Sequence, residues 1–234
     1  MPVFRLPEEY IFPRPERAEP DGLLAIGGDL EPARLIAAYR HGIFPWYAEG
    51  EPLLWWSPSP RLVLFPEEFH LPRRLARTLR QQRFTITADT AFEEVIASCA
   101  ASPGRPNQET WITSDMQQAY CRLHILGYAH SLECWEKERL VGGLYGIALD
   151  RVFFGESMFT AKNDGSKACL TTLVSHASAL NIELIDCQMT TAHLQRFGAR
   201  EISRRHFQEL LHRAITVCAP QKKWHLPQNL PTVC

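Results

Sequence analysis

The sequence predicts an α/β protein of the α+β type, in which helices cover the faces of a mixed sheet. Three strand-like runs, at residues 130–135, 140–149 and 151–159, are joined by polar turns and indicate an antiparallel meander. A helix-like run over residues 166–180 and a strand-like run over residues 183–188 follow them. Ten of the seventeen prolines lie in the first sixty residues, so we expect this part of the chain to be built differently.

The proline-rich part is expected to form a small N-terminal domain over residues 1–62, and residues 63–234 a larger domain. Residues 29–40 predict a helix with Asp29 as its N-cap, Pro32 in its first turn and Gly42 as its stop. The segments GIFPW (42–46) and LLWWSPSPR (53–61) carry too much proline for regular central strands.

The remaining elements of the larger domain follow from capping patterns. The segments TAFE (90–93) and SDMQ (114–117) have the form of a capping box, and each opens an apolar-periodic run that predicts a helix. A short helix is expected near His193, and a last helix is opened by Ser203. The tail from Ala219 carries three prolines and is expected to be extended.

Polar side chains interrupt two of the apolar strands. On the run ELIDCQ (183–188), Asp186 and Gln188 alternate and so point from one face, and on FFGESMF (153–159) Glu156 shares a face with Phe154 and Met158. A buried acid costs on the order of several kcal/mol unless it is paired or used, so a meeting of these groups indicates a functional site. The alternative is that both acids cap loops or pair with arginines.

A basic helix is expected just after the proline-rich part. Leucines recur at every fourth position from Leu71 to Leu79, which predicts an amphipathic helix. Its polar side would carry a run of arginines: Arg73, Arg74, Arg77, Arg80 and, just beyond, Arg83. Two interpretations remain open, a contact to an RNA backbone and an ordinary solvated helix face.

Composition restricts the class of protein. The net charge of −1 gives no global attraction to nucleic acid. The seven cysteines form no CxxC pair and are odd in number, which favours a reducing compartment. The N-terminus lacks the apolar core of a signal peptide and no apolar run is long enough for a membrane span, so we expect a cytosolic protein. The nine histidines form no metal-binding pattern, and no metal site is expected.

Eight short blocks, taken in order, closely resemble one protein family. They are DGLLAIGGDL (21–30), GIFPW (42–46), WWSPSPR (55–61), TWIT (110–113), GGLYG (142–146), FFGESMF (153–159), SKACL (166–170) and LIDCQ (184–188). The family is that of the leucyl/phenylalanyl-tRNA-protein transferases. The resemblance runs from about residue 21 to residue 215.

The resemblance implies an acetyltransferase-like C-terminal domain behind a small family-specific N-terminal domain. It implies transfer of Leu, Phe or, less readily, Met from aminoacyl-tRNA to a protein whose N-terminus is Arg or Lys. Such tagging marks the acceptor for degradation by the bacterial N-end rule route. The expected partners are therefore aminoacyl-tRNA and these proteins, with no cofactor and no membrane, and the expected state is a monomer.

The resemblance also suggests a role for individual residues. Trp46 and Trp111 correspond to the pair that stacks on the terminal adenosine of the tRNA. A pocket for the donor side chain corresponds to Leu144, Met158, Leu170, Leu173 and Ile185. Asp186 and Gln188 are expected at the reacting centre, with Glu156 attracting the cationic acceptor and Tyr120 donating a hydrogen bond.

Two rival functions fit parts of the pattern. A coenzyme-A-dependent N-acetyltransferase would share the sheet, but its pyrophosphate needs a glycine-rich turn, and TAKNDGSK (160–167) offers one glycine. A non-catalytic tRNA-binding protein would need the arginines and tryptophans but not the acid and amide cluster.

Overall fold

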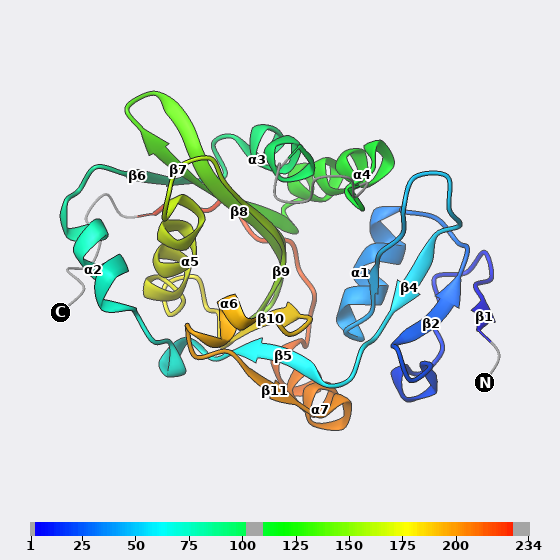
Figure 1. The fold of residues 1–234 in the computed structure, drawn as a ribbon. Coiled ribbons are helices and arrows are strands. Elements are labelled where there is room, and N and C mark those ends of the chain that lie inside the picture. Colours follow the sequence, from blue (N-terminus) through cyan, green and yellow to red (C-terminus); the bar gives the residue numbers. More distant parts are fainter. Residues whose placement is uncertain (1–2, 102–109, 227–234) are drawn as a thin grey trace.

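The computed structural model describes residues 3–101 and 110–226, and it has the predicted mixed α/β class, with two sheets (Figure 1). The larger sheet has seven strands in the order β11-β5-β10-β9-β8-β7-β6. Their bounds are β5 (Arg61–Leu64), β6 (Thr85–Ala88), β7 (Ala129–Glu136), β8 (Arg139–Leu149), β9 (Val152–Thr160), β10 (Leu184–Gln188) and β11 (Arg200–Ile202). Every neighbouring pair is antiparallel except β9 and β10, which run parallel.

The predicted meander is confirmed as β7, β8 and β9, which lie side by side in the large sheet between β10 and β6. Parallel strands need a crossover, and here it is the helix α5 (Gly165–Ser175) between β9 and β10. The strand after it, β10, returns beside β9 and carries Asp186 and Gln188. The crossover therefore brings the polar cluster of the two strands together.

Helices cover both faces of the large sheet (Figure 1). On one face α3 (Phe92–Ala100) and α4 (Ser114–Ile125) bury apolar residues in what we call the first core. On the other face α5 and the basic helix α2 (Arg73–Arg80) bury theirs in the second core. The short α6 (Ala192–Gln195) and the last helix α7 (Arg204–Ala214), capped by Ser203 as predicted, complete the domain. Within the described residues no helix is long and apolar enough to cross a membrane.

Three helix ends of the larger part differ from their predicted positions. The N-cap of α3 is Ala91 rather than Thr90, because the Thr90 hydroxyl bonds the buried Glu133 carboxylate instead. The N-cap of α4 is Thr113, whose hydroxyl accepts the Met116 N–H. Helix α5 ends at Ser175, five residues before the predicted end at 180.

The proline-rich part forms a four-stranded sheet in the order β1-β2-β4-β3, with the helix α1 (Pro32–Arg40) packed on it (Figure 1). Its strands are β1 (Phe4–Arg5), β2 (Leu23–Ile26), β3 (Phe44–Pro45) and β4 (Leu54–Trp56), and a 3₁₀ turn lies at Pro15–Arg17. A second 3₁₀ turn, Pro66–Glu68, follows β5 of the large sheet. The prediction of no central strand in the proline-rich part was wrong for β4, since its prolines lie outside the paired residues. The N-cap of α1 is Glu31 rather than Asp29, whose carboxylate binds Arg34.

The chain passes from the small sheet to the large one between Trp56 and Arg61. The first core includes residues of both parts of the chain, among them Tyr39 of α1, Phe44 of β3 and Phe154 of β9. The two parts therefore share apolar packing. A domain boundary at residue 62 stays a prediction.

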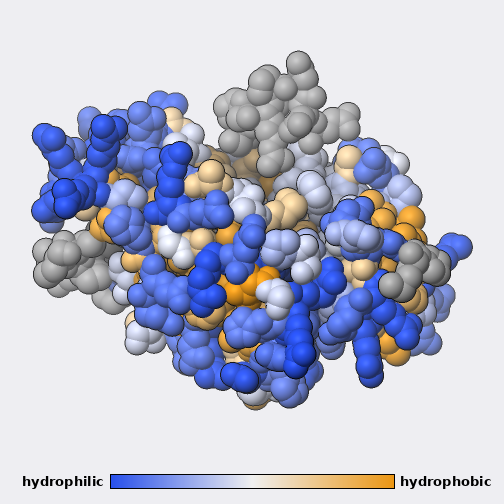
Figure 2. Space-filling model, turned by 60° about the horizontal axis from the view of Figure 1, so that its bottom comes forward, coloured by the Kyte–Doolittle hydropathy of each residue, from blue (hydrophilic) through white to orange (hydrophobic). Residues whose placement is uncertain are grey.

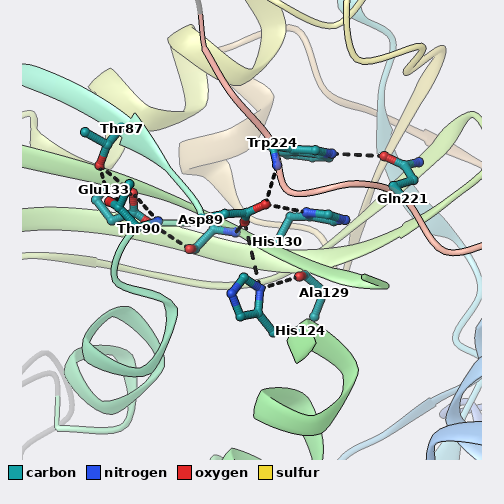
Figure 3. A network of polar contacts seen from close by, with 10 residues as sticks. Thr87, Asp89, Thr90, His124, Ala129, His130, Glu133, Gln221 and Trp224 are labelled. Carbon is teal, nitrogen blue, oxygen red and sulfur yellow. Dashed lines mark hydrogen bonds and ion pairs between the residues drawn. The ribbon is translucent and has the colours of Figure 1, made fainter. Parts of the chain in front are cut away.

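The segment after α7 is tied to the large sheet by Asp89 (Figure 3). The buried Asp89 carboxylate accepts the N–H groups of Ser131 at 2.9 Å and Trp224 at 2.6 Å, and it lies 2.8 Å from His130 Nδ1. The Trp224 ring stacks on His130 and also contacts Phe153. Residues 219–226 form neither helix nor strand, in keeping with the expected tail, and the rest of that tail lies outside the described residues.

Candidate active site

Glu156 lies in a bulge between β8 and β9. Tyr145 pairs with Ser157 and the next residue, Gly146, pairs with Gly155, so Glu156 has no partner across the ladder. A bulge adds one residue to one strand and bends it away from its neighbour. The one sign of it in the sequence is Gly155, an isolated glycine inside the strand-like run.

The bulge changes which face of the sheet the residues of β9 occupy. Phe154 lies in the first core, whereas Met158 packs against the second core, although both are an even number of residues from Glu156. The prediction that all three side chains share one face was therefore wrong. Period-two reasoning holds only while the ladder is regular, and the bulge at Glu156 breaks it.

Strand β10 is irregular at its end as well. Asp186 pairs with Val63, but Gln188 pairs with the next residue, Leu62, so the register shifts between them. Gln188 has a φ of 60°, in the left-handed region that few residues other than glycine adopt. The regular ladder therefore ends before Gln188, yet the side chains of Asp186 and Gln188 both lie beside Glu156.

A chain of hydrogen bonds joins these two irregular positions. The Gln188 side-chain amide donates to Glu156 Oε1 over 2.8 Å, and the Tyr120 hydroxyl donates to Glu156 Oε2 over 3.0 Å. The hydroxyl of Tyr39, from α1, forms a short hydrogen bond with that of Tyr120. The predicted meeting of Glu156 and Gln188 is confirmed. The hydrogen bond of Tyr120 goes to Glu156, and a role of Tyr120 toward the substrate stays a prediction.

Burial raises the pKa of Glu156 to about 7. The hydroxyls of Tyr39 and Tyr120 and the Gln188 amide oppose this rise by bonding the carboxylate, while the charge of Asp186 adds to it. Burial and the Glu156 charge raise the pKa of both tyrosines well above 10, so they stay neutral donors. Near pH 7 Glu156 is therefore divided between its charged and neutral forms.

Asp186 lies beside this chain and is ion-paired with Arg61 of β5. Arg61 Nε lies 2.8 Å from Asp186 Oδ1 and Nη2 lies 2.6 Å from Oδ2, and both side chains are buried. The same Oδ1 accepts the Gln188 main-chain N–H at 2.9 Å. For Asp186 the alternative of pairing with an arginine is confirmed, while Glu156 makes no ion pair within the described residues.

These groups adjoin a cavity of about 340 Å³ between the ends of β9 and β10. Ten of the eleven predicted catalytic and substrate-binding residues border it: Trp46, Trp111, Leu144, Glu156, Met158, Leu170, Leu173, Ile185, Asp186 and Gln188. Asp186 adjoins the cavity, but its side chain is completely shielded from solvent. Tyr120 lies behind Glu156 and outside the cavity lining.

The cavity has an apolar part and a polar part. Leucine, isoleucine and methionine side chains of β8, β9, α5 and β10 form the apolar part, and they belong to or pack on the second core. Glu156 and Gln188 form the polar part, with Trp46 and Trp111 in the same lining. Such a site can hold an apolar side chain beside a polar reacting group.

Comparison with known proteins agrees with this geometry. The family model for leucyl/phenylalanyl-tRNA protein transferase matches residues 63–212, and the model for the N-terminal domain of these proteins matches residues 28–59. The chain belongs to this family. The resemblance drawn from the eight blocks is thus confirmed.

Relatives of this family cover almost the whole chain. A leucyl/phenylalanyl-tRNA–protein transferase of Syntrophobacter fumaroxidans is 57 % identical over 224 residues, which are 96 % of each protein. Among solved structures, FemX covers 76 % of this chain and 70 % of its own at 9 % identity, with a TM-score of 0.43. A GCN5-related N-acetyltransferase from Kribbella flavida covers 74 % of this chain and 61 % of its own at 11 % identity, with a TM-score of 0.34. Both structural likenesses are partial.

Sequence reasoning missed several residues of the site. Tyr39 and Arg61 bond the predicted residues from positions far away in the chain. Arg61 opens the otherwise apolar strand RLVL, and a charge at the start of a buried strand is a signal that a carboxylate partner should be sought. The cavity is also lined by residues outside the prediction, among them Phe44, Tyr145, Phe153, Cys187, Met189, His193 and Leu194.

The basic helix α2 lies apart from the cavity, packed on α5 through the buried Leu75. Its arginines are exposed as predicted: Arg73, Arg74, Arg77 and Arg80. Figure 2, which views the molecule from the side of β5, β10 and β11, shows hydrophilic side chains gathered at the end that carries α2. Contact of these arginines with tRNA stays a prediction.

Proposed function

We propose that this protein transfers Leu, Phe and, less readily, Met from aminoacyl-tRNA to the α-amine of proteins that begin with Arg or Lys. The observation that carries the proposal is the cavity, which puts an apolar pocket next to the hydrogen-bonded pair of Gln188 and Glu156. The relative from Syntrophobacter fumaroxidans is named for transfer from leucyl- and phenylalanyl-tRNA to protein, which supports the same donors here.

The apolar part of the cavity takes the donor side chain. We call it the donor pocket, and it consists of Leu144, Met158, Leu170, Leu173 and Ile185. An apolar pocket discriminates one methylene by only about 1 to 3 kcal/mol, so one pocket serves Leu, Phe and Met. The flexible side chain of Met158 helps it to adapt to their different shapes.

Trp46 and Trp111 hold the terminal adenosine of the tRNA by stacking. A stacked base contributes about 1 to 3 kcal/mol and requires no particular tRNA sequence, which suits an enzyme with several donors. Trp46 is itself held in place, because its carbonyl accepts the Trp56 indole N–H at 2.7 Å and the two rings pack edge to face.

Glu156 attracts the acceptor N-terminus and takes up one of its protons. Arg and Lys share a charge but not a shape, so a negative site is what accepts both of them. An α-ammonium has a pKa near 8, close to the pKa of about 7 that burial gives to Glu156. Proton transfer between groups of similar pKa costs little, and it leaves the amine neutral and nucleophilic.

The amine then attacks the ester carbonyl carbon of the donor. A carbon–nitrogen bond forms, the ester carbon–oxygen bond breaks, and a proton passes from the nitrogen to the departing ribose oxygen. Because the ester is already activated, positioning of the two reactants dominates the rate. The Gln188 amide group donates to Glu156, which leaves its carbonyl oxygen free to orient the amine.

The biological setting belongs to the proposal as well. Addition of Leu or Phe would mark the acceptor protein for degradation by the N-end rule route. Charged tRNA as donor places the reaction in the cytosol, and the protein would act as a monomer. No cofactor enters the reaction, because the ester supplies the activated acyl group.

The two rivals fit the site less well. An acetyltransferase would bind a pyrophosphate at the start of α5, but the N-cap there is Asp164, whose carboxylate binds Lys167 and Thr78. Gly165 adjoins the main chain of β8, so this turn packs on the sheet. A protein that only binds tRNA would have no use for a buried carboxylate and amide beside the donor pocket.

The test is transfer of labelled Leu from charged tRNA to a peptide that begins with Arg. The matched control is the same peptide with an acetylated N-terminus, which lacks the nucleophile. Label should appear only in the free peptide. Absence of transfer from Leu-, Phe- and Met-tRNA, or acetylation of the peptide by acetyl-coenzyme A instead, would refute the proposed function.

A further inference from the structure

Arg61 is enclosed more completely than an ordinary ion-pair partner. Only 1 % of its side chain is exposed, and its guanidinium lies between the rings of Phe44 at 4.9 Å and Phe207 at 4.7 Å. Stacking on two aromatic rings and a two-point bond to a carboxylate are both properties of arginine rather than lysine. The position of the guanidinium is therefore determined on three sides.

The Arg61 guanidinium determines in turn where the Asp186 carboxylate lies. Both carboxylate oxygens bind Arg61, and Oδ1 also accepts the Gln188 N–H. The last bond spans the register shift at the end of β10, where Gln188 leaves the regular strand conformation. A left-handed residue other than glycine persists only where its surroundings hold it, and here the carboxylate does so.

The turned main chain directs the Gln188 side chain toward Glu156. The amide–carboxylate bond of 2.8 Å is made from this left-handed conformation, so a change of the main chain at Gln188 would move the amide relative to Glu156. Arg61 itself does not border the cavity, and Asp186 has no accessible surface there. Neither side chain is placed to receive a proton from the acceptor amine.

We propose that Arg61 is a positioning residue of the reacting centre, acting through the Asp186 carboxylate on the conformation of Gln188. Asp186 thus serves as a fixed acceptor for the main chain rather than as a base. The inference rests on the proposed function, because it assigns Gln188 to orientation of the amine. It adds Phe44 and Phe207 as the residues that hold the guanidinium in place.

The test compares Arg61→Lys with the wild-type protein in single-turnover transfer. Lysine keeps the charge but binds as a single point, so Asp186 loses its two-point partner. We expect the transfer rate to fall by about 10²-fold, the loss that follows a misplacement of about 1 Å. Binding of an aminoacyl-adenosine analogue should stay within about twofold of wild type, since the donor is held elsewhere.

A double-mutant cycle with Gln188→Ala separates positioning from general damage. If Arg61 acts through Gln188, Arg61→Lys should cause no further loss in the Gln188→Ala background. The matched control is Arg34→Lys, which changes another arginine with 1 % exposure, outside the site and bound to Asp29. Its rate per folded molecule should equal that of wild type.

A second variant covers the case in which Arg61→Lys does not fold. Replacing the pair together, as Arg61→Met with Asp186→Leu, removes both buried charges and is tolerated in other proteins. It should fold and bind the analogue but show the slow transfer of Gln188→Ala. Three results would overturn the inference: a normal transfer rate in either variant, a loss of analogue binding as large as the loss of rate, or rate losses of Arg61→Lys and Gln188→Ala that multiply when combined. Absence of transfer by the wild-type protein would instead refute the proposed function.

Discussion

Gln188 donates its side-chain amide to Glu156 over 2.8 Å from a main chain held at a φ of 60°. Two irregular strand positions thus meet at one hydrogen bond, since Glu156 is the extra residue of a bulge and Gln188 follows a register shift. Strand irregularities of this kind re-aim side chains, often beside active sites. Both groups border the cavity, where their side chains meet.

The pH dependence of transfer should report Glu156. With the donor saturating, peptide use should fall below about pH 7, because the carboxyl group becomes protonated there and can neither attract the ammonium nor accept its proton. In Glu156→Gln the fall should instead lie at about pH 8, where the α-amine of the peptide itself becomes protonated, and peptide use should be low throughout, with aminoacyl-tRNA binding less affected. The measurement is kcat/KM for the peptide between pH 5.5 and about 9.

The control for this prediction is Glu183→Gln, which changes an exposed glutamate paired with Arg151. Its pH profile should match that of wild type. If Glu156→Gln loses peptide use and tRNA binding equally, Glu156 has no special role toward the acceptor.

Folding stability should also depend on Glu156. Its pKa is about 7 in the folded protein, against 4.5 for the free side chain, so the folded state binds more protons between these values. Stability from this group is therefore present at low pH and is lost as the pH rises from about 4.5 to about 7, by on the order of 3 kcal/mol. Urea unfolding of wild type and Glu156→Gln at pH 5 and pH 8 should show a relative gain for the variant at pH 8. A constant difference between the two would contradict the raised pKa.

Stacking on adenosine predicts how Trp111→Ala behaves. Small aminoacyl-adenosine analogues and full-length tRNA should both bind more weakly, by roughly 1 to 3 kcal/mol. The matched control is Trp135→Ala, a half-buried tryptophan outside the cavity lining. If the analogue binds normally and only full-length tRNA binds less well, Trp111 acts away from the adenosine.

The basic helix should contact the tRNA backbone. Replacing Arg77 and Arg80 by Ala should weaken tRNA binding and lower its salt dependence by about one unit of slope per lost phosphate contact. The control pair, Arg205 and Arg213 of α7, is equally exposed but lies on another helix. An unchanged slope in the α2 variant would assign these arginines to an ordinary solvated face.

Much of the site was predictable because its polar residues lie on strands whose other residues are mostly apolar. Asp186, Gln188 and Glu156 attracted attention as polar residues in apolar runs, and the family resemblance supplied the donor pocket and the two tryptophans. The meander was also predictable, since its turns are short and polar and each strand is long.

The rest was not predictable, for identifiable physical reasons. A bulge is one extra residue, and in FFGESMF its single local sign is Gly155, which does not by itself fix which residue is left unpaired. Arg61 lies 125 residues before Asp186, and Tyr39 lies 81 residues before Tyr120, so neither partnership leaves a local pattern. Thr90 fitted a capping box, but the buried Glu133 takes its hydroxyl instead.

The most direct test of this account is the single-turnover rate of transfer from Leu-tRNA to an Arg-peptide by wild type, Gln188→Ala, Glu156→Gln and the double variant. If the two residues act as one unit on the amine, each single change should slow transfer by roughly 10²-fold without weakening donor binding. The double variant should then be little slower than the slower single variant. A normal rate in Gln188→Ala, or losses that multiply in the double variant, would contradict the account.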